Sequence, residues 1–210
     1  MGIAERKERE KQQRREEIVG AATDVFFSKG FDKATMDDIA NQAELSKGTL
    51  YLYFSSKDDL YMAVARNGIQ LLREKTNAAV EKGGSALDKL LLMGRTCVDF
   101  ARTHPDYMKS IMTLEELEPG EMNLTVEDVQ DIIYRESTVA SVVQVIEQGV
   151  EEGVFRNDLP ALLVANTLWM SVLSVIRFVT MKHRLIAMLD LSPEKVFESH
   201  FQIVINGIKA

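Results

Sequence analysis

The chain has 210 residues, of which 46% are hydrophobic and 27% are charged, a composition that excludes a largely disordered protein and allows a buried core. Only four prolines and twelve glycines, together with many Leu, Ala, Glu and Met residues, predict an all-α fold. The net charge of −7 would disfavour a nucleic-acid partner if it were spread evenly, but residues 1–57 hold ten Lys or Arg and ten Asp or Glu, so the remainder carries the whole excess.

Cysteine content and the apolar stretches bear on the compartment. Cys97 is the single cysteine, which excludes an internal disulfide and fits a reducing cytoplasm. The N-terminus is charged rather than apolar, unlike a secretory signal peptide. Residues 159–176 are uncharged, but polar side chains interrupt them and the stretch is short for a bilayer crossing of about 20 residues. We therefore expect a cytoplasmic protein without a membrane span.

Apolar residues at helical spacing, from Ile18 to Phe26, predict a first helix over about residues 6–28 that ends before Gly30. The first fifteen residues carry six basic side chains and three glutamates. Two interpretations of this segment stay open: a solvated extension of the helix, and a basic arm that contacts DNA.

The stretch over residues 35–60 contains several helix-start signals. Thr35 can cap a short helix, with Asp38 three residues later as its capping-box partner. After a short turn, Ser46 can cap a second helix whose Leu50 falls on the buried side. Two short helices joined by such a turn predict a helix-turn-helix.

The second helix of such a motif enters the major groove with its first turn nearest the base edges. Lys47 can reach a guanine edge or a phosphate, and Tyr51 offers a hydroxyl and apolar surface for a thymine methyl. Tyr53 and Lys57 fall farther along, where phosphate contacts are expected. The predicted DNA-binding residues are Thr35, Ser46, Lys47, Gly48, Thr49, Tyr51, Tyr53 and Lys57.

The pattern T-x3-IA-x2-A-x-LS-x-GTLY-x-YF-x2-K-x2-L over residues 35–60 resembles the signature of the TetR family of bacterial transcriptional regulators. The resemblance implies a DNA-binding domain over residues 1–60 and a helical effector-binding and dimerisation domain over residues 61–210. It also implies a homodimer that binds a palindromic double-stranded DNA operator and is released by a small-molecule effector. Glu44 departs from the pattern, because the family usually has glycine there; a positive φ would cost on the order of 1 kcal/mol.

Capping and breaking residues predict further helices beyond this motif, about nine in the whole chain. The first of them begins at Ser56 and crosses the predicted domain boundary without a flexible linker. The expected helices cover residues 56–80, 85–104, 105–117, 125 to about 149, 159 to about 183, and 192 to the end of the chain.

The helix over residues 159–183 is apolar on nearly every side, so it must be covered on every side, in part by a second copy of the chain. The last helix carries one apolar stripe. These two helices form the predicted dimer interface, through Leu168, Val172, Val175, Ile176, Phe197, Phe201, Val204 and Ile205.

The resemblance implies an effector pocket among the helices between residues 85 and 183. Ten methionines favour an adaptable apolar cavity, because Met fills irregular space, and we expect an apolar or amphipathic guest. Each candidate residue also has an ordinary place in a hydrophobic core. The candidates are Met93, Cys97, Phe100, Met108, Met112, Tyr134, Trp169 and Phe178.

Two other classes of function compete with a regulator. An enzyme is disfavoured, because His104, His183 and His200 are isolated and neither a glycine-rich phosphate loop nor metal-ligand spacing occurs. The alternative that stays open is an all-helical ligand-binding or partner-binding protein that does not use its helix-turn-helix on DNA; the basic and hydroxyl side chains of that motif disfavour it. The sequence therefore predicts a dimeric repressor without catalytic activity, cofactor or bound metal.

Overall fold

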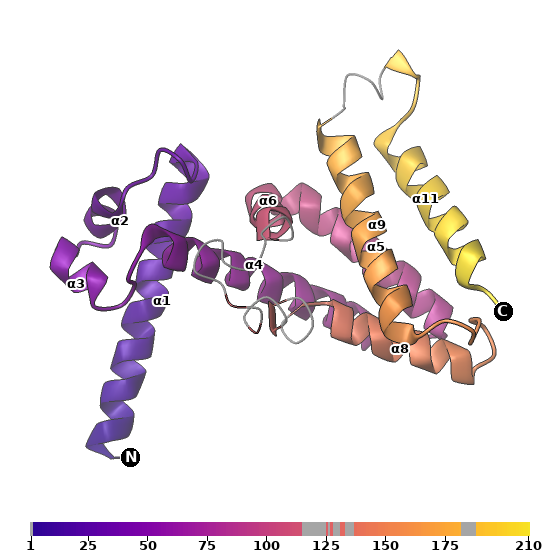
Figure 1. Cartoon of the computed structure of the whole chain (residues 1–210), viewed down its shortest axis with the longest axis horizontal. Helices are drawn as coiled ribbons and strands as arrows, with labels where there is room; N and C mark the ends of the chain where they lie inside the picture. The colour runs from indigo at the N-terminus through magenta and orange to yellow at the C-terminus, as the bar shows by residue number, and fades with distance from the viewer. Residues whose placement is uncertain (1, 115–124, 126, 128–130, 133–136, 182–187) are drawn as a thin grey trace. The chain divides into compact units, whose positions relative to one another are not determined.

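The computed structural model describes residues 2–114, 125, 127, 131–132, 137–181 and 188–210. Within these ranges the chain forms nine α-helices (Figure 1) and one isolated bridge between Phe155 and Lys209. The predicted all-α fold is confirmed. The chain divides into two compact units: unit 1 comprises Met1–Gly68 and Lys109–Val126, and unit 2 comprises Ile69–Met108 and Glu127–Ala210. The boundary predicted at residue 60 stays a prediction.

Unit 1 contains the helix-turn-helix. Its helices are α1 (Ile3–Lys29), α2 (Met36–Gln42), α3 (Lys47–Tyr51), the first part of α4 (Lys57–Val80) and the second part of α6 (Pro105–Leu114). The most deeply buried side chains of its core are at most 4% exposed and include Ile18, Ala22, Phe26, Ile39, Leu50, Phe54 and Leu60. Burying these apolar surfaces holds α3 against the other helices of the unit.

Side-chain caps start the two helices of the motif as the sequence predicts. Thr35 Oγ1 accepts a hydrogen bond from Asp38 N, and the Asp38 carboxylate accepts one from Thr35 N, each at 3.1 Å. Ser46 Oγ accepts from Thr49 N at 3.1 Å. Each cap satisfies an amide that would otherwise lack a partner in the first turn of its helix.

The turn between α2 and α3 contains a residue with left-handed backbone. Glu44 has a φ of 55°. Leu45 N donates to Ala40 O at 2.9 Å, the bond that closes a helix end of this type, where glycine is the usual residue at the position of Glu44. The departure noted in the sequence therefore costs backbone strain without changing the turn.

Glu44→Gly should stabilise the protein by about 1 kcal/mol, because glycine adopts this φ without a steric penalty. Asp190, whose φ is 52°, is the matched control, since aspartate tolerates the left-handed region better and Asp190→Gly should gain less. Urea unfolding of both variants measures the difference. A loss of stability in Glu44→Gly would show that the side chain, rather than the backbone, dominates at this position.

Unit 2 is a helical bundle. It contains α5 (Ala86–Thr103), α8 (Val139–Glu151), α9 (Ala161–Met181), α11 (Pro193–Ile208) and the second part of α4. α9 packs against α5, α8 and α11. By length and hydropathy α9 also meets the criteria for a membrane span, which the buried core helix of a soluble bundle meets equally well.

The helix predicted over residues 125 to about 149 is interrupted in the structure. The sequence predicts a single helix from residue 125 to about 149, whereas the chain turns at Ser137 and Thr138 and α8 begins at Val139. Ser137 Oγ accepts a hydrogen bond from Val139 N at 3.1 Å. A serine that bonds the backbone locally competes with helical hydrogen bonds, which accounts for the break. Several other positions of this stretch lie outside the described residues.

Candidate functional site

The short helix α3 has a buried and an exposed side. Leu50 is fully buried in unit 1, whereas Lys47, Gly48 and Tyr51 are exposed. A basic, a small and a hydroxyl-bearing residue thus share one accessible surface. This surface has the donors, and the room for close approach, that contacts with base edges and phosphates require.

The hydroxyl groups at the helix starts are engaged inside the protein. Thr35 Oγ1 lies 2.8 Å from an Asp38 carboxylate oxygen, and Ser46 Oγ lies 2.8 Å from Thr49 Oγ1. Among the predicted DNA-binding residues, Thr35, Ser46 and Thr49 therefore fix the ends of α2 and α3. In the free protein they orient the exposed residues of α3.

Asp37 lies beside the exposed side of α3, and the sequence analysis missed it. Its Oδ1 is 2.8 Å from Lys47 Nζ, although both side chains remain more than half exposed. Hydrogen bonding and the charge of Asp37 raise the pKa of Lys47 above its ordinary value. Lys47 is therefore charged and held near α2. The available signal was an acidic residue two positions after the Thr35 cap.

Lys57 is tied to the loop between α1 and α2. Its Nζ donates to Phe31 O at 2.9 Å and to Ala34 O at 3.2 Å, and lies 4.3 Å from the centre of the Phe31 ring. A cation over an aromatic face is stabilised by the ring quadrupole. These contacts favour a structural role for Lys57 beside the predicted phosphate contact.

Lys57→Met should lower the free energy of unfolding by about 1 to 3 kcal/mol, because the two charge-assisted hydrogen bonds disappear while the side chain keeps its length. Lys33→Met, at an exposed lysine of the same loop, is the control and should change stability little. Thermal unfolding measures both variants. A phosphate role would instead flatten the salt dependence of DNA binding by about one unit per lost contact at unchanged stability.

The end of α3 presents a second residue that the sequence analysis missed. Leu52 is 80% exposed, while its neighbour Tyr53 is half-buried. Leu50 and Phe54 are four residues apart and share the buried side of the helix, and Leu52 lies between them, on the opposite side. This spacing could have predicted that Leu52 is exposed. Its apolar surface suits contact with a thymine methyl or a sugar.

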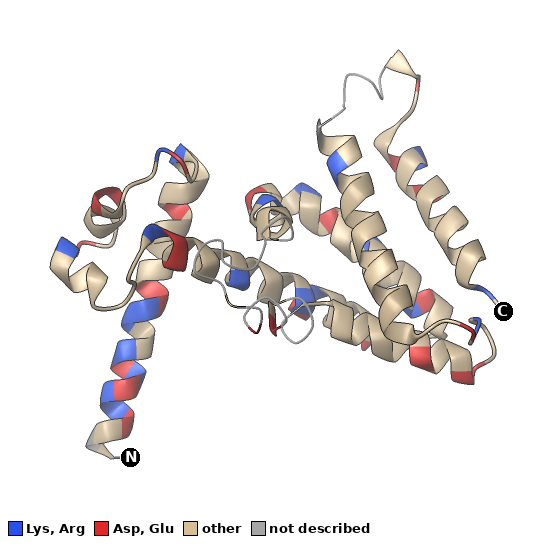
Figure 2. Cartoon of the chain, viewed as in Figure 1, with Lys and Arg blue, Asp and Glu red and all other residues tan. Residues whose placement is uncertain are grey.

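Acidic and basic residues alternate along the N-terminal half of α1 (Figure 2). Arg6 Nε lies 2.8 Å from Glu10, and Arg14 Nη1 lies 2.7 Å from Glu17. These pairs within the helix neutralise part of its basic charge. They favour a solvated extension over a basic DNA-contacting arm.

Unit 2 contains a partly open apolar cavity of about 50 Å³ between α5, α8, α9 and α11. Three residues of the predicted pocket, Met93, Cys97 and Trp169, line it together. The remaining walls are apolar except for the side chains of Thr138, Ser171 and His200.

The other five residues of the predicted pocket do not line this cavity. Phe100 and Met108 are buried elsewhere in unit 2, and Phe178 is half-buried on α9. Met112 belongs to unit 1, and Tyr134 lies outside the described residues. The structure therefore brings together the candidates from the middle of α5 and the middle of α9.

Burial keeps the titratable groups of the cavity uncharged. Desolvation raises the pKa of the Cys97 thiol to about 12. Desolvation also lowers the pKa of His200, whose Nε2 lies 3.5 Å from Ser171 Oγ. Burial therefore disfavours the thiolate of Cys97 and the imidazolium of His200.

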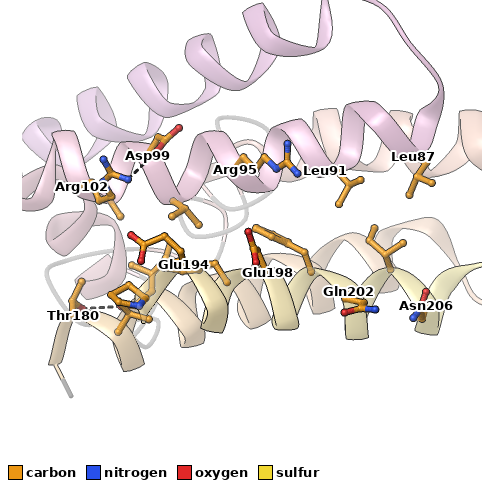
Figure 3. A pocket seen from close by; sticks show the side chains of 18 of the residues that line it. Leu87, Leu91, Arg95, Asp99, Arg102, Thr180, Glu194, Glu198, Gln202 and Asn206 are labelled. Carbon is orange, nitrogen blue, oxygen red and sulfur yellow. Dashed lines mark hydrogen bonds and ion pairs between the residues drawn. The ribbon is translucent and has the colours of Figure 1, made fainter. Parts of the chain in front are cut away.

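A groove of about 820 Å³ runs between α5, α11 and the end of α9 (Figure 3). Its rim carries charges of both signs, with Arg95 and Arg102 on α5 and Glu194 and Glu198 on α11. Phe201 on α11 lines both this groove and the smaller cavity. Its ring lies so close to α5 that a Cβ atom on Gly94 would be 2.4 Å from Phe201 Cε1. Glycine at position 94 is therefore what permits the ring to lie against α5.

The predicted dimer residues lie on α9 and α11, on sides that pack within unit 2. Leu168, Ile176 and Ile205 are buried in the protomer. The other predicted residues are half-buried. All of the predicted dimer residues except Val175 line the cavity or the groove: Leu168, Val172, Ile176, Phe197, Phe201, Val204 and Ile205.

Each of the same two helices also exposes apolar side chains. Leu162, Leu163 and Met170 follow helical spacing on α9, and Ile203 on α11 is exposed as well. Large apolar side chains gathered on one face of a soluble protein mark an interaction surface more often than a free surface.

The chain resembles known regulators over both units. The sequence model for bacterial regulatory proteins of the tetR family matches residues 18–64. The uncharacterized HTH-type transcriptional regulator YvdT of Bacillus subtilis is 50% identical over 52 residues, which are 25% of this chain and 27% of that protein. The HTH-type transcriptional repressor KstR2 of Mycobacterium tuberculosis is 26% identical over 163 residues, 76% of this chain and 80% of that protein.

A solved structure shares the fold at low sequence identity. The transcriptional regulator FadR of Bacillus subtilis, solved in complex with stearoyl-CoA, superposes with a TM-score of 0.70 at 18% identity. The alignment covers 91% of this chain and 98% of that one. The two chains therefore share the same fold.

Proposed function

Because the chain belongs to the TetR family of bacterial regulatory proteins, we propose that it is a cytoplasmic, dimeric repressor without catalytic activity. It binds a two-fold symmetric DNA operator through α3 and leaves it when a small apolar or amphipathic effector binds unit 2. The observation that carries the proposal is the exposed side of α3, where Lys47, Gly48 and Tyr51 stand above a buried Leu50.

A second copy of the chain is required for useful specificity. A helix of five residues makes few base contacts, so two copies on half-sites about 34 to 36 Å apart are needed for a selective complex. The exposed apolar face of α9 and α11, with Leu162, Leu163, Met170 and Ile203, supplies the surface where the copies meet. α9 is then covered by its own unit and by the partner rather than by lipid.

Effector control needs only a modest coupling between the two functions. A 10- to 100-fold loss of operator affinity corresponds to roughly 1.4 to 2.8 kcal/mol. α4 runs without a break from Lys57 to Val80 and contributes residues to both units. A tilt of this helix on effector binding would change the spacing of the two α3 helices. That the related FadR binds stearoyl-CoA supports an apolar or amphipathic effector.

Selection of bound duplexes from a random-sequence library tests the proposal. We expect enrichment of an inverted repeat with half-sites about one helical turn apart. The alternative, a helical ligand-binding or partner-binding protein that does not use its helix-turn-helix on DNA, predicts that no sequence is enriched. A single unrepeated motif would retain DNA binding but contradict the dimer.

A further inference from the structure

We propose that Thr138 is the hydrogen-bond anchor for an uncharged carbonyl or hydroxyl group on an apolar ligand that enters the cavity of unit 2. The inference rests on the proposed function only in treating this ligand as the effector. Three observations carry it: an unpaired buried hydroxyl, a cavity lining without charged side chains, and a wide groove that shares wall residues with the cavity.

The Thr138 hydroxyl is not used by the fold. The residue is 2% exposed, and its Oγ1 has no hydrogen-bond partner in the described part of the chain. Threonine at a helix start normally caps the first turn, but Thr138 has helical backbone angles, φ −66° and ψ −18°, and makes no cap bond. Ser137 Oγ instead accepts from Val139 N. The hydroxyl therefore stays available where Thr138 lines the cavity.

An unpaired buried hydroxyl destabilises a folded protein, since it has lost water and gained nothing in exchange. Such groups are rare in native structures, and each calls for an explanation. A ligand that supplies a carbonyl or hydroxyl oxygen at this point would complete the hydrogen bond. The same geometry gives a purely hydrocarbon ligand no such partner.

The rest of the cavity excludes a charged group. Asp, Glu, Lys and Arg are absent from its described lining, and burial disfavours the charged forms of the Cys97 thiol and the His200 imidazole. An ionised group placed among these residues would lose its hydration without finding a counter-charge. The part of the ligand that reaches Thr138 is therefore uncharged.

The size of the cavity shows where the rest of the ligand must go. A volume of about 50 Å³ holds only a few non-hydrogen atoms. Leu91, Phe201 and Ile205 line both this cavity and the groove of about 820 Å³, so the two spaces share a wall. We expect a longer ligand to move a side chain of this shared wall, such as the Phe201 ring beside Gly94, and to extend into the groove, where polar and charged side chains of α5 and α11 can meet a more polar end.

Trp169 provides the readout, because it lines the cavity and is the single tryptophan of the chain. Its fluorescence is followed while the intact protein is titrated with 2-octanone, with 2-methyl-1-octene, and with octanoate at pH 7.5. The alkene matches the ketone in shape but lacks the oxygen, and octanoate is a charged compound of equal chain length. Each titration is repeated with Thr138→Val, which replaces the hydroxyl by a methyl group, and with Thr138→Ser, which keeps it.

Thr138→Val should weaken binding of 2-octanone about 3- to 10-fold and leave binding of the alkene unchanged, as expected for the loss of one neutral hydrogen bond. Thr138→Ser should retain the preference for the ketone, and octanoate should bind at least about tenfold more weakly than the ketone. An equal effect of Thr138→Val on ketone and alkene, octanoate binding as tight as the ketone, or no response of Trp169 to any probe would each overturn the proposal.

A second measurement tests the unpaired hydroxyl without any ligand. Thr138→Val should melt at the wild-type temperature or above it, because an unsatisfied polar group is replaced by an apolar group of the same shape. A lower melting temperature, or a variant that does not fold, would show that the hydroxyl has a partner in the protein and would overturn the assignment. Operator selection by the wild-type chain is independent of these outcomes, so a failed anchor and a failed regulator are distinguishable.

Discussion

Lys47→Ala should weaken operator binding by about 30-fold or more, because each of the two protomers loses one contact to a base edge or phosphate in the major groove. Lys47 is the basic residue in the first turn of α3, and its Nζ is accessible apart from the ion pair with Asp37. An exposed ion pair of this kind is readily exchanged for a phosphate or a guanine. Fluorescence anisotropy with the selected duplex measures the change.

Lys82→Ala is the matched control, since it removes the same charge from an exposed lysine of unit 2. It should leave operator affinity within about twofold of wild type, as expected for an exposed lysine outside the unit that contains the helix-turn-helix. Equal effects of the two substitutions would assign the loss to net charge. An unchanged Lys47→Ala would remove α3 from the interface.

Leu163→Glu should convert the dimer into monomers and lower operator affinity at least about 100-fold, because a two-fold interface would place two like charges in an apolar contact. Leu163 lies on the exposed face of α9 and is 55% exposed in the protomer. The substitution should leave the protomer folded, since the side chain does not belong to its core. Sedimentation and operator binding are measured on the same sample.

Leu189→Glu is the control for this substitution. Leu189 is 56% exposed, close to the value for Leu163, but it lies outside the α9 and α11 helices. It should leave the dimer and the operator affinity intact. Monomers from both variants, or from neither, would place the dimer contact on another surface.

Local signals in the sequence were enough to predict the helix-turn-helix. Thr35 and Ser46 each bond an amide three residues later, and this geometry depends on the residues of one helical turn. Leu50 and Phe54 are four residues apart and share the buried side of the motif. The exposed side of α3 follows from the same spacing, so the residues expected to contact DNA could be named without coordinates.

Contacts between residues far apart in the chain determine features that the sequence pattern did not predict. On α9 apolar residues occur all round, so periodicity does not distinguish Leu168, which packs inside unit 2, from Leu163, which faces outward. The sequence predicts that Lys57 is a surface residue that contacts phosphate. In the structure its ammonium group donates to the carbonyl groups of residues 31 and 34, which are more than 20 positions away in the chain and come close only in the folded protein. The local bond of Ser137 to Val139 N prevailed over a helical pattern that spans it.

Cross-linking from α3 shows directly whether two copies of this helix lie against the operator. A Tyr51→Cys variant can be labelled there with a photoactivatable reagent, because Tyr51 is exposed while Cys97 is buried and its pKa is raised to about 12. If two α3 helices bind the operator, we expect cross-links at two positions of the selected duplex, about 34 to 36 Å apart and related by its two-fold symmetry. Cross-links at one position, at positions unrelated to the repeat, or at none would contradict it.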